Sequence, residues 1–348
     1  SVGRTFIDSL YFGRGTGTNY NNVAIGDSTL LRNTTGFGNT VIGDSALRLN
    51  TSGFDNTAIG NKAGAAITTT GGNTIVGSNA GLTLTSVANT AVGNEALKAA
   101  AGNFNTAVGF FALRANTGTR NVGIGASALL SNTVGSGNIA IGYNAAAANL
   151  TGCSIVVIGD QAVSAGTGSY TTAVGASTLP NLTTGVANLG FGYNSGWGIT
   201  TGSYNVIIGG QTSALPGSRS NYVIINDGGG NTAFLKDSIG RAGIATITPN
   251  SSLSIGGSFS IAYVAKTANY TATINDYFID CPSNSFTVTL PTAVGITGRI
   301  YVIKNSGTAT VITVATTGGE TIDGTTPPTL TTLVPLKVIS DGANWKTF

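Results

Sequence analysis

One pattern of apolar and polar positions repeats twelve times between residues 22 and 209. In each copy a large apolar residue precedes a glycine, and asparagine stands four positions before that glycine in ten copies. Alanine occurs three positions after the glycine in eight copies, and leucine often follows. A unit with a fixed period of 16 or 17 residues predicts a solenoid with one repeat per coil. The repeated glycines are Gly26, Gly43, Gly60, Gly77, Gly93, Gly109, Gly125, Gly142, Gly159, Gly175, Gly192 and Gly209.

The residues before each glycine predict short β-strands. Four-residue apolar runs rich in Val, Ile and Thr, bounded by Asn and Gly, are too short for a stable helix. We expect two short strands in each coil, with Asn and Gly at corners that need a positive φ. Stacked coils then pair their strands in parallel. A further run, residues 221–225, has Asn226 in the place of the glycine and is expected to cap the array.

Side-chain alternation predicts which residues lie inside the coil. Residues one and three positions before the glycine share a face, and the residue two positions before it points the opposite way. The first face carries bulky aliphatic residues or Thr and is expected to fill the coil. The second row is small and apolar, which favours an interface with other copies of the chain; the alternative is a thicker coil with both faces inside. The predicted interface consists of Ala24, Val41, Ala58, Ile75, Ala91, Ala107, Ala140, Val157, Ala173 and Ile207.

The pattern changes after residue 225. A stretch rich in Gly and Ser follows, and from residue 261 alternating runs such as FTVTL and RIYVIKN are separated by Pro, Gly and Asn turns. Such runs predict a small antiparallel β-sandwich. The expected fold is therefore all-β, with an N-terminal segment (1–21), a β-roll repeat domain (22–225), a neck (226–260) and a C-terminal β-sandwich (261–348).

The composition excludes several classes of function. The net charge is only +3 and no cluster of Lys or Arg exists, so we expect no nucleic-acid binding. No run of 18 apolar residues occurs, so we expect no membrane insertion. The chain has no His, which removes the common nucleophile triads and His-based metal sites. We expect no enzyme activity, no cofactor and no metal ion.

The acidic residues of the C-terminal region and the two cysteines also allow predictions. Asp276, Asp280, Glu320 and Asp323 could supply a glycosidase carboxylate pair, as in a glycan-cleaving tailspike, but acids scattered on surface turns are the simpler interpretation. Cys153 and Cys281 lie in different expected domains, so we predict two small buried thiols and no disulfide.

The repeat also resembles known fibrous proteins. The segments NTAIGNKAG, NTAVGNEAL and NTAVGFFAL are similar to the head repeats of trimeric autotransporter adhesins and to repeats in phage tail fibres. The C-terminal segment that begins FTVTLPTAVGITGRIYVIKN resembles the β-sandwich tips of phage fibres. This resemblance implies a left-handed parallel β-roll, a homotrimer and attachment to a host. The period is longer than in the adhesins, so we expect the extra residues to form a loop. The sequence shows no membrane-anchor barrel or long coiled-coil stalk, which favours a tail fibre of a virion over a cell-surface adhesin.

We therefore expect an extracellular fibre whose terminal domain binds a host-surface or cell-surface glycan or protein. Exposed aromatic rings and amides suit carbohydrate, and the candidates are Tyr263, Tyr270, Tyr277, Asn284, Asn305 and Trp345. Alternatively the terminal domain registers the trimer, and loops of the roll, Thr34–Gly38 and Asn50–Phe54, bind the partner. A purely structural filament and an ice-binding face also stay open; the latter would use a Thr column that six copies interrupt with Val, Ile or Leu.

Overall fold

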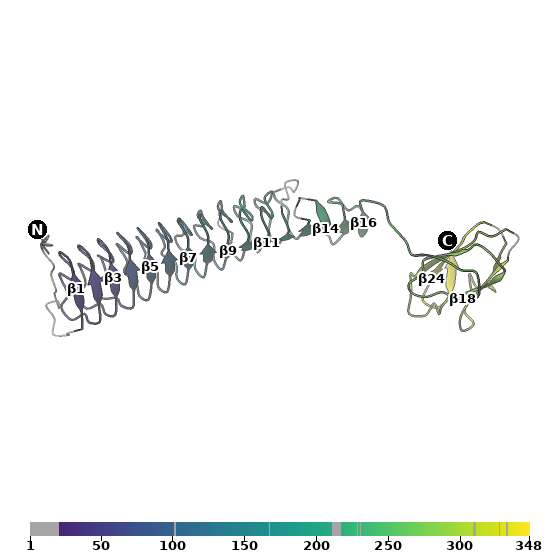
Figure 1. The fold of residues 1–348 in the computed structure, drawn as a ribbon, viewed down its shortest axis with the longest axis horizontal. Coiled ribbons are helices and arrows are strands. Elements are labelled where there is room, and N and C mark those ends of the chain that lie inside the picture. Colours follow the sequence, from purple (N-terminus) through teal and green to yellow (C-terminus); the bar gives the residue numbers. More distant parts are fainter. Residues whose placement is uncertain are drawn as a thin grey trace, which may run out of the picture. The chain divides into compact units, whose positions relative to one another are not determined.

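The computed structural model describes residues 21–348 except 101, 167, 211–216, 228, 230, 309, 310, 327 and 332. These residues form strands and turns and no helix, which confirms the all-β prediction. The chain divides into two compact units (Figure 1), the first ending at Gly257 and the second running from Ser258 to Phe348. The predicted N-terminal segment, residues 1–21, lies outside the described residues except for Asn21.

The first unit is a parallel β-solenoid, as predicted. Each of the twelve repeats contributes one three-residue strand, which pairs in parallel with the strand of the next repeat. A thirteenth strand, β13 (Val223–Asn226), continues the stack. The repeat strands are β1 (Val23–Ile25), β2 (Thr40–Ile42), β3 (Thr57–Ile59), β4 (Thr74–Val76), β5 (Thr90–Val92), β6 (Thr106–Val108), β7 (Val122–Ile124), β8 (Ile139–Ile141), β9 (Val156–Ile158), β10 (Thr172–Val174), β11 (Leu189–Phe191) and β12 (Val206–Ile208).

The second half of each coil is a turn, so the prediction of two strands per coil is wrong. In the fifth coil Glu95 and Leu97 have φ angles of 55° and 47°, which curls the backbone. This left-handed conformation costs about 1–2 kcal/mol for a non-glycine residue. The cost is offset because the Leu97 N–H donates to the carbonyl of Ala112 in the next coil (3.0 Å) and the Leu97 side chain is fully buried. The turns therefore add a second ladder of hydrogen bonds along the stack.

The small apolar row fills the coil, which reverses the prediction. The middle residue of each repeat strand points inward, as Ala91 does, and packs with turn residues such as Ala96 and Leu97. A coil of 16 or 17 residues is narrow, so one small strand residue and one leucine occupy its cross-section. The predicted trimer interface is therefore core, at most 5% exposed: Ala24, Val41, Ala58, Ile75, Ala91, Ala107, Ala140, Val157, Ala173 and Ile207.

Neighbouring coils compensate for one another in volume. Gly64 stands where six of the twelve coils have a buried leucine. The side chains of Ile75 and Ile67 extend into the space that the leucine would fill. A Cβ atom on Gly64 would lie 2.9 Å from the Cδ1 atom of Ile75 and 3.1 Å from that of Ile67. The interior is thus close-packed although individual repeats differ in sequence.

The repeated asparagines form a buried ladder instead of the corners predicted for them. The Oδ1 atom of Asn105 accepts the N–H of Asn121 in the next coil (2.9 Å). Its Nδ2 donates to the carbonyls of Gly102 (2.9 Å) and Gly118 (3.0 Å). The corner with positive φ falls one residue earlier, at Phe104 (φ 61°). Asparagine is therefore required for its two-sided hydrogen bonding.

Three strands beyond β13 extend the same sheet into the segment predicted as a neck (226–260). They are β14 (Thr232–Lys236), antiparallel to β13, β15 (Ala242–Ile244), antiparallel to β14, and β16 (Leu253–Ile255), parallel to β15. The solenoid sheet thus reaches Ile255, and only a short segment joins it to the second unit.

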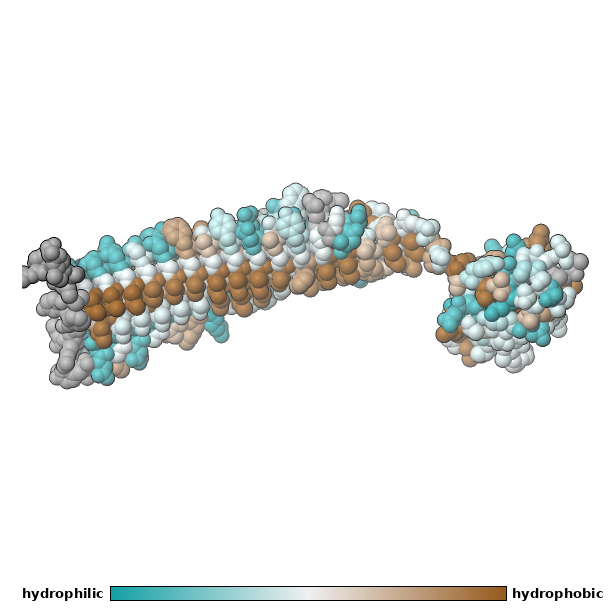
Figure 2. Space-filling model, viewed as in Figure 1, coloured by the Kyte–Doolittle hydropathy of each residue, from teal (hydrophilic) through white to brown (hydrophobic). Residues whose placement is uncertain are grey.

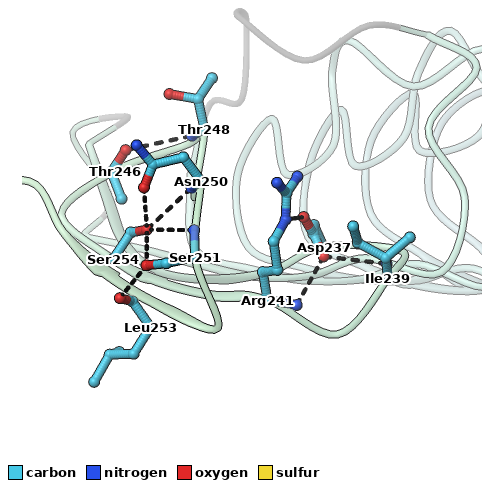
Figure 3. A network of polar contacts seen from close by, with 9 residues as sticks. All are labelled: Asp237, Ile239, Arg241, Thr246, Thr248, Asn250, Ser251, Leu253 and Ser254. Carbon is cyan, nitrogen blue, oxygen red and sulfur yellow. Dashed lines mark hydrogen bonds and ion pairs between the residues drawn. The ribbon is translucent and has the colours of Figure 1, made fainter.

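Polar side chains hold the turns between these last strands (Figure 3). The Oδ1 atom of Asp237 accepts the N–H of Arg241 (2.8 Å), and its Oδ2 pairs with the Arg241 guanidinium (2.7 Å). In the next turn the Oγ of Ser254 accepts the backbone N–H groups of Asn250 (3.0 Å) and Ser251 (3.3 Å). These contacts replace the asparagine ladder, which ends with the regular repeats.

The second unit consists of two sheets around one core. The five-stranded sheet has the order β17 (Tyr263–Ala265), β19 (Phe278–Cys281), β21 (Ile300–Asn305), β24 (Leu336–Ser340), β25 (Trp345–Thr347). The four-stranded sheet has the order β18 (Tyr270–Thr271), β20 (Phe286–Thr289), β22 (Ile312–Ala315), β23 (Thr329–Leu330). Buried residues of both sheets, including Ile279, Tyr301, Val288 and Val314, belong to the same apolar cluster.

The pairing in this unit is mixed, not antiparallel throughout as predicted. From β17 to β22 the chain alternates between the two sheets, so successive strands of one sheet run in the same direction. Antiparallel pairing begins only with β23, β24 and β25. Alternation places Ile279 and Ile303 in the core, while Phe278, Asp280 and Lys304 lie on the opposite, outer face of the five-stranded sheet.

Candidate functional site

The solenoid carries a continuous apolar stripe on its surface (Figure 2). Because the middle residue of each strand points inward, the first and third residues point outward. We define the apolar stripe as the first and third residues of β1 to β12 with Val223 and Ile225 of β13. All of its third residues are large and apolar, whereas six of its first residues are threonine. Among them Ile42 and Ile124 are each 37% exposed, and Phe191 is 55% exposed.

The stripe is large for the surface of a monomer. Thirteen strands spaced by about 4.8 Å make it about 60 Å long, and three residues make it about 10 Å wide. Its area of about 600 Å² is at the upper end of the largest apolar patches on monomeric proteins. It approaches the roughly 800 Å² that each partner contributes to a stable interface.

A second surface feature is an open pocket on the outer face of the five-stranded sheet. It has a volume of about 310 Å³ and is lined by Ile261, Tyr263, Phe278, Asp280, Lys304 and Ser306. Strands β17, β19 and β21 are neighbours, and their register places Tyr263 beside Phe278 and Asp280 beside Lys304. The pocket therefore combines an aromatic side with a charged side.

The aromatic side is a stacked pair. The rings of Tyr263 and Phe278 have centroids 5.8 Å apart and planes inclined by 20°. Tyr263 is 63% exposed, whereas Phe278, beside it on the neighbouring strand, is half-buried. The Tyr263 hydroxyl donates to Oδ2 of Asp280 (2.8 Å), and this hydrogen bond raises the pKa of Tyr263 above its ordinary value. The tyrosine therefore stays neutral and keeps a fixed orientation.

The charged side holds one carboxylate and one ammonium group. Both oxygens of Asp280 accept hydroxyl hydrogens, Oδ2 from Tyr263 and Oδ1 from Ser306 (2.5 Å). Lys304 has no ion pair or hydrogen bond through its ammonium group among the described residues. Asp280 thus orders the pocket wall, and Lys304 offers a free donor to a ligand.

Three of the six predicted binding residues lie at or near the surface. Tyr263 lines the pocket, and Tyr277 is half-buried just before β19. Asn284 is exposed on a turn with φ of 65° and donates from Nδ2 to the carbonyl of Thr267 (3.0 Å). The structure therefore brings only Tyr263 into the pocket.

Trp345 and Asn305 are fully buried, which corrects the prediction for these two, and Tyr270 is partly buried. Trp345 is fully buried and packs edge-on against Tyr301 with ring centroids 5.5 Å apart. Asn305 is fully buried and donates to the Leu330 carbonyl (2.7 Å), which joins β21 to β23 of the other sheet. Tyr270 packs against the core beneath the Lys266 ammonium group (3.9 Å). Trp is highly buried on average, and a buried amide needs a hydrogen-bond partner such as the one that Asn305 finds.

Sequence reasoning missed Phe278, Lys304 and Ser306 as pocket residues. The available signal was alternation: in FIDC and IYVIKN the residues that flank buried Ile279 and Ile303 must face outward. That these outward positions adjoin across β19 and β21 depends on a parallel pairing that the sequence did not indicate.

The four acids considered for catalysis accept hydrogen bonds from neighbouring protein groups. Asp276 binds Tyr270 and Thr273, Glu320 binds the Ala293 N–H (2.9 Å), and Asp323 binds Thr347. In the described ranges no three or more acidic, Cys or His residues are grouped to hold a metal ion.

No protein-family model, curated protein or solved structure matches the chain. Within the part of the chain that the structure describes, no helix is long and apolar enough to cross a membrane.

Proposed function

We propose that this chain is a subunit of an extracellular homotrimeric fibre. In it the solenoids of three copies pack through their apolar stripes, and the C-terminal domain contacts a glycan or protein on a host surface. We favour a phage tail fibre, because the resemblance of the NTAIG-type repeat and of the C-terminal segment points to that class. A cell-surface adhesin and a purely structural filament are the other forms that the same assembly can take.

The observation that carries the proposal is the apolar stripe. It contains no charged residue from β1 to β13, and its bulky members lie in rows along the whole stack. Burial of this face, most of whose outward residues are apolar, would stabilise an assembly at about 25 cal/mol per Å² of apolar surface. A narrow, straight stripe suits closed packing about a common axis, in which each copy presents the same face.

Sedimentation equilibrium tests the proposal on the whole chain. We expect a trimer at micromolar concentration, and a stable monomer would refute it. The variant Ile124→Asp places a charge in the stripe and should dissociate the assembly, because an unpaired charge at an interface is costly. The control Ala126→Asp lies two residues away at a position where Asp27, Asp44 and Asp160 already occur, so it should assemble normally.

The outward threonines support a second candidate function, ice binding. Thr40, Thr57, Thr74, Thr90 and Thr106 stand on five consecutive strands and point outward, on the flat face of a regular parallel sheet. In the later coils Val122, Ile139 and Val156 take this position, which favours contact with protein. Thermal hysteresis measured on the intact chain distinguishes the two candidate functions. Hysteresis would support ice binding, and its absence would favour the fibre proposal.

A further inference from the structure

We propose that the pocket formed by Tyr263, Phe278, Asp280, Lys304 and Ser306 binds a single pyranose ring that carries a negatively charged substituent. This inference rests on the proposed function, in which the C-terminal domain contacts a host surface. It goes further, because it names the site and the chemical class of its ligand.

The aromatic pair provides a platform for a sugar ring. The Tyr263 side chain is 63% exposed, and its ring stacks against Phe278 on the neighbouring strand. The C–H groups on one face of a pyranose pack well against such a surface, while the hydroxyl groups at its edge stay free for hydrogen bonds. The volume of about 310 Å³ lies at the lower end of small-molecule sites and fits one ring.

The platform is held in place before a ligand arrives. The hydrogen bonds from Tyr263 and Ser306 fix both oxygens of Asp280, and through them the tyrosine ring. These side chains belong to or directly follow paired strands, so the backbone beneath them is also fixed. A preorganised wall lowers the entropy that binding must lose.

The charge pattern selects an anionic substituent. Lys304 faces the pocket with a free ammonium group, and exposed Lys337 lies across β21, beside Val302, without an ion pair of its own in the described chain. Asp280 is the one acidic pocket residue, and hydroxyl donors already engage both of its oxygens. A carboxylate or similar group on the sugar therefore gains a charge-assisted hydrogen bond at Lys304 and is directed away from Asp280.

Titration calorimetry on the full chain tests this assignment with two probes that differ by one group, methyl β-D-glucuronide and methyl β-D-glucoside. We expect binding in about the millimolar range, as is usual for a single small ring. The glucuronide should bind roughly five- to tenfold more tightly at about 20 mM salt, and the preference should shrink at about 500 mM salt. Equal affinity for the two probes, or no binding of either, would overturn the proposal.

Point variants locate the site. Tyr263→Ala should weaken binding of both probes roughly five- to tenfold, because it removes the stacking surface. Lys304→Gln should abolish the preference for the glucuronide and leave glucoside binding unchanged. The control Lys346→Gln lies at the opposite edge of the same sheet, on β25, and should change neither affinity. Tyr263 is exposed, so circular dichroism should show all variants folded.

Failure of this inference can be told apart from failure of the proposed function. If the intact chain binds host cells and this binding survives both Tyr263→Ala and Lys304→Gln, the pocket assignment is wrong and the fibre proposal stands. If both variants lose binding to cells and to the glucuronide in parallel, the pocket is the contact site.

Discussion

Gly93 lies so close to Gly109 of the next coil that a Cβ atom on Gly93 would overlap the Gly109 carbonyl group. The same relationship links each repeated glycine from Gly26 to Gly175 to the next along the stack, as with Gly43 and Gly60. Gly93 also has a φ of 134°, which side chains rarely adopt. Two independent constraints, backbone conformation and close approach of coils, therefore require glycine at this position.

Gly93→Ala should destabilise the solenoid by more than about 2 kcal/mol, because the added Cβ atom violates both constraints. Gly72→Ala is the matched control. Gly72 has a φ of 71°, but its Cβ would meet only Ala88 atoms at 3.9 Å, so the cost should be about 1 kcal/mol from conformation alone. Guanidinium unfolding followed by circular dichroism measures both. Equal losses would show that contact between coils adds nothing.

The asparagine ladder should be more important than exposed asparagines. Asn105→Ala leaves the buried N–H of Asn121 without its acceptor. It also removes one of two hydrogen bonds at the carbonyls of Gly102 and Gly118, which keep Ser86 and Asn116 as donors. One unsatisfied buried group costs about 1–3 kcal/mol, so we expect a loss of that size. Asn94→Ala, at an exposed position in the preceding coil, should cost less than about 0.5 kcal/mol. Guanidinium unfolding measures the stability of both variants. Similar losses of stability would contradict the structural role of the asparagine ladder.

The second unit should lose stability in acid through Asp276. Burial by itself would raise the pKa of this carboxyl, but hydrogen bonds from Thr273 (2.7 Å) and Tyr270 (2.7 Å) outweigh it and lower the pKa below 3.8. A lowered native pKa stabilises the fold above about pH 4, and this contribution is lost as the pH falls through the native pKa. Melting temperatures of Asp276→Asn should be lower near neutral pH but should fall less in acid than those of the wild type.

An exposed carboxylate serves as the comparison. Asp341 also has a lowered pKa, because the backbone N–H groups of Asn344 and Ala343 bind it, but solvent surrounds it. Asp341→Asn should therefore change the acid sensitivity less than Asp276→Asn does. A larger effect at Asp341 would show that Asp276 is not the principal acid-sensitive group of the two.

The two cysteines should differ in reactivity. Both thiols are free, and Cys281 is fully buried. Burial, followed by the nearby charge of Asp280, raises the pKa of the Cys281 thiol to about 11, so it stays protonated near neutral pH. Cys153 is only partly buried. A chromogenic disulfide reagent at about pH 8 should label one thiol in the folded chain and two after denaturation. Two thiols labelled at the same rate before denaturation would contradict this.

The sequence was most informative where a constraint recurs in every coil. The glycine period predicted a parallel solenoid, and Gly93 shows why the period is strict: each coil approaches the next too closely for a side chain. The change of pattern after residue 225 predicted a further β-region, and the observed division falls near residue 258. A local constraint of this kind requires the same residue in each repeat, so it can be recognised from one sequence.

The direction in which each side chain points was decided by the tertiary structure. Alternation predicts that Ala91 and Val92 point to opposite sides of the strand, but it does not predict which of them lies inside. In the narrow coil the alanine lies inside. In the second unit, composition did not reveal that Trp345 is core, nor that Tyr263, Asp280 and Lys304 meet on neighbouring strands. Which side chains lie inside depends on the cross-section of the closed coil. The residues that form the pocket depend on which strands pair. Both are properties of distant residues brought together, and no short stretch of sequence contains them.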